Sequence, residues 1–403
     1  MRTLFLFLFV VGIVFGNPLQ EAIRKAPERA TIELGEGEFG GNIVITKPIR
    51  LKGIKGKTLL RGSGKGTVLT IRSSDVVLEN LTVKNSGKNA FSRDSGILIE
   101  NAQNVTVRNC VVKQVLHGID IERSKGVVIE NSTITSYENS IPLRGDGVKV
   151  FYSSDTTLRN NTIYGTRDIS ITFSNGSKII GNLFENNRFA THFERSNDNL
   201  IKNNTYRYNS VALMFMGTKN SMVRENRILS SKGAAAIGVV VGKGSGFHFE
   251  DNSVRFNAKG LYIEATEKAR GMKRYLIGND ISYNKEALHF HAAIRENTIR
   301  HNRFVGNIDD VVLDLPGSFE SSNDVALNHW DRYAGFDSDR DGVGDTPFIL
   351  YRYVDKLWQQ NHRLKYFFAT PVLSFLNFLS ELAPFVQPTV LMIDPKPLLL
   401  KQD

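Results

Sequence analysis

The sequence predicts a right-handed parallel β-helix, because a strand-forming tripeptide recurs at nearly constant spacing and apolar residues alternate within each repeat. The tripeptide is an Asn, any residue, and then a β-branched or aromatic residue. Its copies begin at Asn109, Asn161, Asn182, Asn204, Asn226, Asn252, Asn279 and Asn302. From Asn161 onward, successive copies are 21, 22, 22, 26, 27 and 23 residues apart. Ser132-Thr133-Ile134 fills the gap after Asn109, and Leu81-Thr82-Val83 extends the series upstream.

The pattern inside each repeat is that of strands. Apolar residues alternate with period two in residues 118–122 and 260–264, and no stretch of the repeat keeps a helical period. Three short strands and their turns fill roughly 22 residues, which is one coil of a β-helix. We therefore expect about 10–11 coils of three strands each. The recurrent Asn fits a turn where stacked side-chain amides bond to one another and where left-handed backbone is tolerated.

Both ends of the repeat are expected to carry other structure. Residues 1–16 combine Arg2, an apolar run and a Val14-Phe15-Gly16 cleavage pattern, so we expect a secretory signal peptide and a periplasmic location. Residues 17–315 are predicted to form the β-helix, with an amphipathic helix over residues 19–26 as its N-terminal cap. Residues 316–403 are predicted to form a C-terminal cap, an acidic loop and a docking tail, with one helical stretch at residues 372–382.

The composition limits the classes of partner that this protein is expected to bind. The formal net charge of +10 suits an acidic partner or an anionic surface. The basic residues are scattered and the chain is predicted to be exported, so nucleic acid is not an expected partner. The single cysteine, Cys110, excludes an internal disulfide, and we interpret it as a buried structural thiol.

The repeat predicts which residues face outward on one sheet. The expected inward residues of its successive coils are Ile121, Phe173, Phe193, Phe215, Val240, Ile263 and Phe290. Their neighbours then form two outer columns. The first column is Asp120, Thr172, His192, Met214, Val239, Tyr262 and His289. The second is Glu122, Ser174, Glu194, Met216, Val241, Glu264 and His291.

Two methionines on the outside of one strand, with a histidine one coil away, indicate copper. Thioether and imidazole ligands are the set that selects Cu(I). Neighbouring coils lie about 4.8 Å apart and same-face residues of one strand about 6.6 Å apart, so His192, Met214 and Met216 can reach one ion. His289 and His291 share a face three coils further on, where they would form a second site or a relay point. The other interpretation of exposed Met is a protein-docking surface.

An acidic loop indicates calcium. Asp occupies positions 1, 3, 5 and 9 of a short run with Gly at position 6, namely Asp337, Asp339, Asp341, Asp345 and Gly342. Alternating carboxylates around a sharp turn are how oxygen ligands wrap Ca²⁺. Phe348 stands where an EF-hand has its bidentate Glu, so a solvated acidic turn is the alternative.

The chain resembles the NosD family of periplasmic β-helix accessory proteins in nitrous oxide reductase maturation. The resemblance rests on residues 188–193 (RFATHF), 196–198 (SND) and 211–215 (VALMF), and on 328–337 (NHWDRYAGFD) before the acidic loop and residues 346–348 (TPF). Pro384 and residues 394–398 (DPKPL) fit the family's tail. The similarity extends over nearly the whole mature chain. Glu194 stands where the family tends to carry a further Met.

This resemblance implies a non-enzymatic role in supplying copper to nitrous oxide reductase. The expected partners are a membrane ABC transporter, a periplasmic copper carrier and the reductase. Two other functions stay open. One is a carbohydrate-active enzyme (a lyase, hydrolase or epimerase acting on an acidic polysaccharide), for which Asp120 and Glu122 share a face, with Arg144 and Asp146 nearby in the sequence. The other is a scaffold without metal that docks a membrane complex through an aromatic tail, namely Tyr366, Phe367, Phe368, Phe375 and Phe378.

Overall fold

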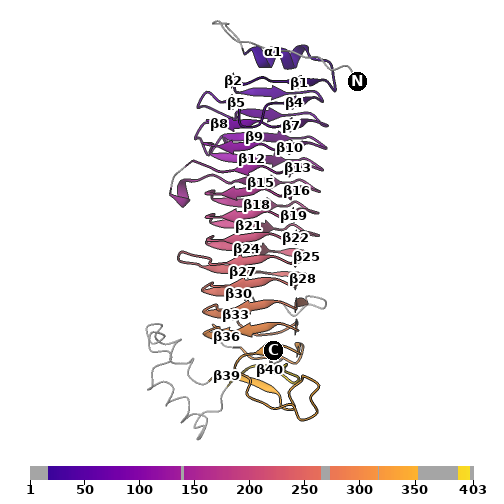
Figure 1. The fold of residues 1–403 in the computed structure, drawn as a ribbon, viewed down its shortest axis with the longest axis vertical. Helices are drawn as coiled ribbons and strands as arrows, with labels where there is room; N and C mark the ends of the chain where they lie inside the picture. Colours follow the sequence, from indigo (N-terminus) through magenta and orange to yellow (C-terminus); the bar gives the residue numbers. More distant parts are fainter. Residues whose placement is uncertain (1–16, 138–139, 265–272, 316, 353–388, 400–403) are drawn as a thin grey trace.

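The chain forms a rod of stacked coils (Figure 1). The computed structural model describes residues 17–137, 140–264, 273–315, 317–352 and 389–399. Three parallel sheets of 13, 13 and 12 strands run along the rod, and each full coil contributes one strand to each sheet. The predicted parallel β-helix with three strands per coil is therefore confirmed. The predicted signal peptide, the 372–382 helix and the aromatic residues of the tail lie outside the described residues.

We call the sheets A, B and C in the order in which a coil visits them. Sheet A contains β1 (Thr31–Glu33), β4 (Arg50–Lys52), β7 (Val77–Glu79), β10 (Thr106–Arg108), β13 (Val128–Glu130), β16 (Thr157–Arg159), β19 (Lys178–Ile180), β22 (Leu200–Lys202), β25 (Thr218–Arg224), β28 (Gly244–Glu250), β31 (Arg274–Ile277), β34 (Asn297–Arg300) and β37 (Asp324–Ala326). Sheet B contains β2 (Gly37–Gly40), β5 (Thr58–Arg61), β8 (Thr82–Lys84), β11 (Val111–Lys113), β14 (Thr133–Ile134), β17 (Thr162–Tyr164), β20 (Leu183–Glu185), β23 (Thr205–Arg207), β26 (Arg227–Leu229), β29 (Ser253–Arg255), β32 (Asp280–Ser282), β35 (Arg303–Val305) and β38 (His329–Trp330). Sheet C contains β3 (Ile43–Ile45), β6 (Leu69–Ile71), β9 (Ser95–Glu100), β12 (His117–Glu122), β15 (Val148–Phe151), β18 (Asp168–Thr172), β21 (Phe189–Glu194), β24 (Val211–Met216), β27 (Ile237–Val241), β30 (Lys259–Glu264), β33 (Glu286–His291) and β36 (Asp309–Leu313).

The rod has more coils than the predicted 10–11, since sheets A and B each hold 13 strands. The first two coils were not predicted, because Gly37 and Thr58 occupy the position that Asn holds in later coils. At the other end, β37 and β38 continue sheets A and B beyond residue 315, where the sequence analysis ends the repeat.

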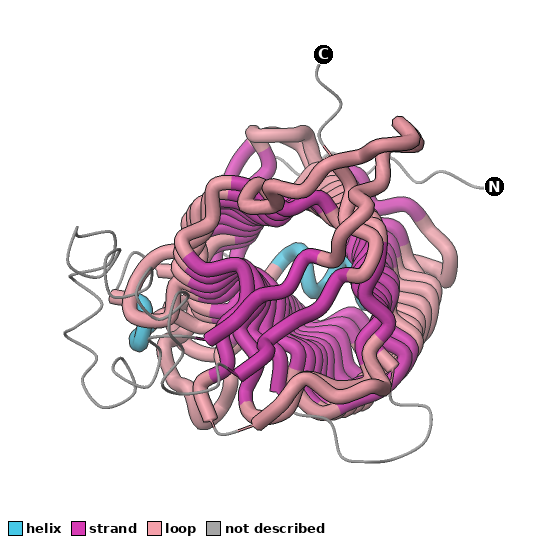
Figure 2. The backbone as a smooth tube through the Cα atoms, turned by 90° about the horizontal axis from the view of Figure 1, so that it is seen from below, coloured by secondary structure: helices cyan, strands magenta, loops and turns pink. Residues whose placement is uncertain are grey.

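The N-terminal cap is the short helix α1 (Pro18–Lys25), as predicted. Asn17 begins it by accepting the Gln20 backbone N–H at 3.2 Å, which satisfies one of the unpaired donors of the first turn. Leu19 and Ile23 are buried, so the apolar face of the helix covers the first coil (Figure 1). In the end-on view α1 lies across the interior of the coil (Figure 2).

Stacked amides hold the turn between sheets A and B. Each Asn Nδ2 donates to the Oδ1 of the Asn one coil further on, at 2.9–3.1 Å, through the series Asn161, Asn182, Asn204, Asn226, Asn252, Asn279, Asn302 and Asn328. Each backbone N–H in this series also donates to the next Oδ1, as Asn161 does to Asn182 at 2.9 Å. The predicted amide ladder is therefore present, and a buried polar column is fully hydrogen-bonded from coil to coil.

The alignment of the first Asn was wrong by one residue. Cys110, and not Asn109, occupies the ladder position, because its backbone N–H donates to Ser132 Oγ at 3.0 Å. Asn109 is the preceding turn residue, with a left-handed φ of 53°. The two positions are adjacent in the turn and both favour Asn, as in Asn160-Asn161, so the sequence pattern does not separate them. Burial raises the pKa of the Cys110 thiol to about 12, which fits the predicted structural role.

The C-terminal cap terminates this ladder with a carboxylate. Strand β40 (Thr389–Asp394) pairs antiparallel with β39 (Phe348–Arg352) and ends at the buried Asp394. Asp394 Oδ2 accepts the backbone N–H of Asn328 at 3.1 Å and its Nδ2 at 3.0 Å. It also accepts Trp330 Nε1–H at 3.0 Å. Asp394, which lies far beyond the last coil in the sequence, thus accepts hydrogen bonds from the N–H groups of that coil.

Candidate functional site

The outer face of sheet C carries the predicted site, with two corrections to the register. Ile171, and not Phe173, faces inward beside Phe193, because Phe173 lies in the turn after β18 with a left-handed φ of 49°. Val241, and not Val240, pairs with Phe215, since a run of three valines hides the alternation. The prediction also left out β15, which adds Lys149 and Phe151. The first outer column is therefore Leu98, Asp120, Lys149, Ser170, His192, Met214, Val240, Tyr262, His289 and Val312.

The predicted soft-donor cluster is brought together. His192 pairs with Met214 on neighbouring strands, and Glu194 pairs with Met216 in the same way. All four side chains are half-buried on the outer face. Since coils are about 4.8 Å apart, one imidazole, two thioethers and one carboxylate share a patch two strands wide.

His192 presents a ligand atom without a partner. Its Nε2 is buried and makes no hydrogen bond with any residue that the structure describes. Burial lowers the pKa of His192, which favours the neutral imidazole that a metal requires. The Phe189 ring packs edge-on against the imidazole, with 5.7 Å between the ring centroids. Leaving a buried nitrogen unpaired costs free energy.

Gly242 is a site residue that the sequence analysis missed. It follows β27 directly, beside Met216 in the second outer column. A Cβ at Gly242 would lie 2.7 Å from Met216 Sδ, so the thioether rests where any other residue would place its side chain. Gly242 was not predicted as a site residue, because the predicted register placed Val241 in the second outer column instead.

His289 and His291 come together around a carboxylate, apart from the Met pair. Asp314 Oδ2 lies 3.0 Å from His289 Nε2, and Asp314 Oδ1 lies 2.9 Å from His291 Nδ1. His289 Nδ1 lies 2.6 Å from Glu286 Oε2, and the Tyr262 ring stacks on the His289 ring at 5.0 Å. The coils of Val240 and Tyr262 separate this cluster from Met214.

Both imidazoles are thus held by carboxylates that the sequence analysis did not name. Although burial opposes the effect, hydrogen bonds from His289 and His291 hold the pKa of Asp314 below its usual value. Both ring nitrogens of His289 have carboxylate partners, so a metal at His289 would have to displace Asp314 from Nε2. Glu286 and Asp314 were not predicted as partners of the histidines, because they lie at the ends of two different strands. Glu286 begins β33, and Asp314 directly follows β36.

The acidic loop gathers three of its four predicted ligands. Asp337, Asp339 and Asp341 each offer an oxygen within 4.8 Å of the others, and within the described ranges they are the one such group of carboxylate, imidazole or thiol ligands. Gly342 has a φ of 87°, as the predicted sharp turn requires, and its N–H donates to Asp337 Oδ2 at 2.9 Å. Asp345 is not part of the group, because its Oδ2 accepts the Ser338 N–H at 2.9 Å.

The carboxylates of the enzyme hypothesis are covered. Asp120 is 1% exposed, and neither of its carboxylate oxygens has a hydrogen-bond partner in the described part of the chain. Burial raises the pKa of Asp120. Glu122 is also buried and forms an ion pair with Arg93. Burial lowers the pKa of the neighbouring His117 to about 4. A polysaccharide therefore has no direct approach to this pair.

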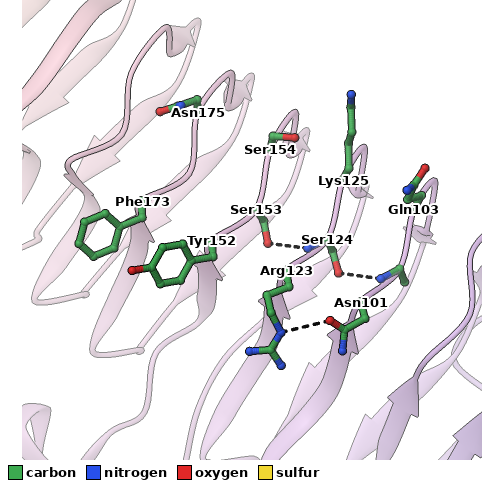
Figure 3. Close-up of a pocket in the computed structure, with 11 residues that line it drawn as sticks. Asn101, Gln103, Arg123, Ser124, Lys125, Tyr152, Ser153, Ser154, Phe173 and Asn175 are labelled. Atoms are coloured by element: carbon green, nitrogen blue, oxygen red, sulfur yellow. Dashed lines mark hydrogen bonds between the residues drawn. The ribbon is translucent and has the colours of Figure 1, made fainter.

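A small groove of about 500 Å³ lies beside this region, at the turn from sheet C to sheet A. Figure 3 shows two rows of side chains along it, with Arg123, Tyr152 and Phe173 in one row and Lys125 in the other. Tyr152 and Phe173 stack at 5.0 Å. Both cations already face carboxylates, Arg123 at 3.7 Å from Glu122 and Lys125 at 3.8 Å from Asp155. None of the described residues that line this groove carries an imidazole or a thioether, so these residues do not continue the soft-donor patch.

The site residues fall within a family model. Residues 133–335, half of the chain, match the model described as periplasmic copper-binding protein (NosD). The chain belongs to the NosD family. Residues 66–195 also match a model for right-handed β-helix regions. The NosD match spans the soft-donor patch and the His289 cluster.

Known proteins agree with this assignment. The chain is 24% identical over 370 residues to a probable ABC transporter binding protein NosD of Pseudomonas aeruginosa, an alignment that covers 88% of this chain and 85% of the relative. It is also 24% identical to the protein of the same name in Stutzerimonas stutzeri, with 88% and 83% covered. Among solved structures, the A-module of the Azotobacter vinelandii mannuronan C-5 epimerase AlgE6 is similar, with a TM-score of 0.58 at 15% identity over 77% of this chain and 93% of that one. At that identity the likeness concerns the fold alone.

The NosD family is described as periplasmic, and both relatives are named as probable ABC transporter binding proteins. Within the described ranges, no helix has the length and apolar character needed to cross a bilayer.

Proposed function

We propose that this NosD protein binds copper on the outer face of sheet C, with His192, Met214 and Met216 as ligands. The observation that carries the proposal is the buried, unpartnered His192 Nε2 on the strand beside two outward thioethers. Imidazole with thioethers is a soft set that favours Cu(I). Glu194, where the family tends to carry a further Met, makes the patch less soft and supplies a fourth donor at its edge.

His289 and His291 are proposed as a second copper point on the same face. Imidazole and carboxylate suit a more oxidised or more weakly held ion than thioethers do. Asp314 would exchange its hydrogen bonds to the imidazoles for contact with the ion. Two copper sites on one face, the first with softer ligands than the second, would let copper move along the rod.

The proposed physiological role is delivery of copper towards nitrous oxide reductase in the periplasm. The protein would receive the ion from a periplasmic copper carrier and act together with a membrane ABC transporter. The family description and the transporter named in the relatives support this role. Export would depend on the signal peptide predicted in residues 1–16.

A complementation experiment tests the role. A denitrifying strain without its own NosD protein receives wild type, the His192→Ala, Met214→Ala, Met216→Ala triple variant, or Met222→Ala. Met222 is a matched control, since it is half-exposed on sheet A away from the patch. We expect the triple variant to leave the reductase deficient in copper and Met222→Ala to restore it. Full restoration by a triple variant that binds no copper would establish the scaffold function instead.

Gly242→Ala is expected to weaken Cu(I) binding about tenfold while the fold is kept. The added methyl would lie 2.7 Å from Met216 Sδ and 2.9 Å from the Phe215 carbonyl oxygen, so both the thioether and the local backbone must shift. Anaerobic competition with a chromogenic chelator measures the affinity. Gly35→Ala is the control, because a Cβ there meets no atom within 4 Å. Unchanged Cu(I) affinity in Gly242→Ala would mean that Met216 is not a ligand.

The polysaccharide enzyme is the less favoured function. Acid–base catalysis on a sugar needs carboxylates that reach the glycosidic bond, and Asp120 and Glu122 are covered or paired. Release of unsaturated sugar from pectin or alginate by the purified protein would decide for it.

A calcium ion at the acidic loop is proposed as a structural cation of the C-terminal cap. Asp337, Asp339 and Asp341 supply the clustered oxygens, and the backbone N–H groups that now bind them would be released in part. We expect millimolar Ca²⁺ to raise the melting temperature of wild type by a few degrees and to have no effect on Asp339→Asn. Equal shifts in both proteins would leave the loop a solvated turn.

A further inference from the structure

A second groove, larger than the one beside Asp120, lies away from the copper residues. It has a volume of about 1130 Å³ and follows the turn from sheet B to sheet C. Its lining extends from Lys113, at the end of β11, to Lys232 and Gly233, just after β26. The lining residues come from several consecutive coils, so the groove runs along the rod. Since coils are about 4.8 Å apart, a groove of this extent suits an elongated ligand.

The lining of this groove is basic. Lys113, Arg144 and Lys232 are among the described residues that line it, and none of those residues is an Asp or Glu. Lys113 and Lys232 are exposed and make no ion pair with any described carboxylate. Lys232 Nζ instead lies 2.6 Å from Asn186 Oδ1. Two exposed lysines that have no described carboxylate partner attract anions from solution to this groove.

The same lining offers exposed aromatic rings. Tyr164 is 42% exposed and Tyr208 is 45% exposed. Lys232 Nζ lies 5.5 Å from the Tyr208 ring centroid, so cation and ring form one surface. Gln114, Asn186 and Ser210 add neutral amide and hydroxyl groups.

We propose that this groove binds an acidic carbohydrate chain, of the uronate class, without cleaving it. Tyrosine rings stack against the apolar faces of sugar rings, lysines pair with the carboxylates, and amides bond to the hydroxyls. The described lining residues include no Asp or Glu, the residues that serve as the acid–base pair in hydrolysis or elimination of sugars. The net charge of +10 favours the approach of such a chain.

An acidic peptide fits this groove less well. Extended peptides gain much of their affinity from main-chain hydrogen bonds with the receptor. Here the turn's N–H groups are already used between coils, as in Gly165 to Glu185 O at 3.1 Å, Ser210 to Asn187 O at 3.0 Å and Lys232 to Asn209 O at 2.8 Å. The groove therefore offers side-chain hydrogen-bond donors and aromatic rings, which match the hydroxyls, carboxylates and ring faces of a sugar chain.

Calorimetric titration with oligouronates from alginate and pectin tests the proposal, with neutral cello-oligosaccharides and poly-Glu as comparison ligands. We expect the oligouronates alone to bind, and more weakly as salt is raised. The Lys113→Ala, Lys232→Ala double variant and Tyr208→Ala should each weaken binding about tenfold. Tyr283→Ala is the matched control, since Tyr283 has the same left-handed turn conformation and similar exposure (48%) but does not line the groove.

Three results would overturn the proposal. They are no uronate binding by wild type, equal or tighter binding of poly-Glu, and uronate binding that the groove variants do not weaken. Uronate breakdown products after incubation would show cleavage, contrary to the proposal. The copper-ligand variants should bind oligouronates as wild type does, so this test is independent of the proposed copper function.

Discussion

The Met214→Ala, Met216→Ala double variant is expected to lose Cu(I) affinity by roughly a hundredfold or more. Both thioethers lie on β24 beside His192 and Glu194 on β21, so their removal leaves one imidazole and one carboxylate. Cu(I) is a soft ion that gains little from a carboxylate, and two remaining donors bind it weakly. Anaerobic competition with a chromogenic Cu(I) chelator measures the loss directly.

Two further variants make this result specific. His289→Ala with His291→Ala is expected to keep the high-affinity Cu(I) site, because two coils separate that cluster from Met214. Met222→Ala, on the outer face of sheet A, should bind as wild type does. Unchanged affinity in both double variants would leave protein docking as the role of this face and would remove the copper proposal.

The second large effect is expected at the C-terminal end of the amide ladder. Asp394→Ala should lower the free energy of unfolding of the last coils by about 3–5 kcal/mol. Asp394 is fully buried, and its Oδ2 accepts three N–H groups from Asn328 and Trp330. Alanine leaves two buried donors, the Asn328 backbone N–H and Trp330 Nε1–H, without this acceptor, and each such group costs about 1–3 kcal/mol. Asn328 Nδ2 keeps the carbonyl oxygens of Ile299 and Ala326 as acceptors.

Urea unfolding and hydrogen exchange of β37 and β38 measure this effect. Asp394→Asn is the matched control, because its amide keeps one oxygen acceptor at nearly the same volume, and we expect it to lose less than half as much. Stacked repeats couple mainly to their neighbours, so the loss should concentrate in the last coils. Equal hydrogen exchange of these strands in wild type and Asp394→Ala would show that the carboxylate does not hold the cap.

The candidate site was predictable where it depends on strand alternation within one coil. His192, Met214 and Met216 lie together because adjacent repeats of nearly equal length keep the same register. The register was wrong where the local pattern is ambiguous, at Phe173 after a short strand and at three consecutive valines. Asp314 and Glu286 could not be assigned to His289 from the sequence, since their contacts depend on side-chain directions at strand ends.

The β-helix, its three-stranded coils, the helical N-terminal cap and the amide ladder could all be predicted from the sequence. Those features are local and periodic, so each copy of the repeat is independent support for the same architecture. Four features became visible only in the folded chain. Cys110 continues the ladder, Asp394 closes it, Gly242 leaves space for the Met216 thioether, and exposed lysines and tyrosines share one groove. These contacts join residues at irregular separations, and distances between side chains, which no periodic pattern encodes, decide whether they form.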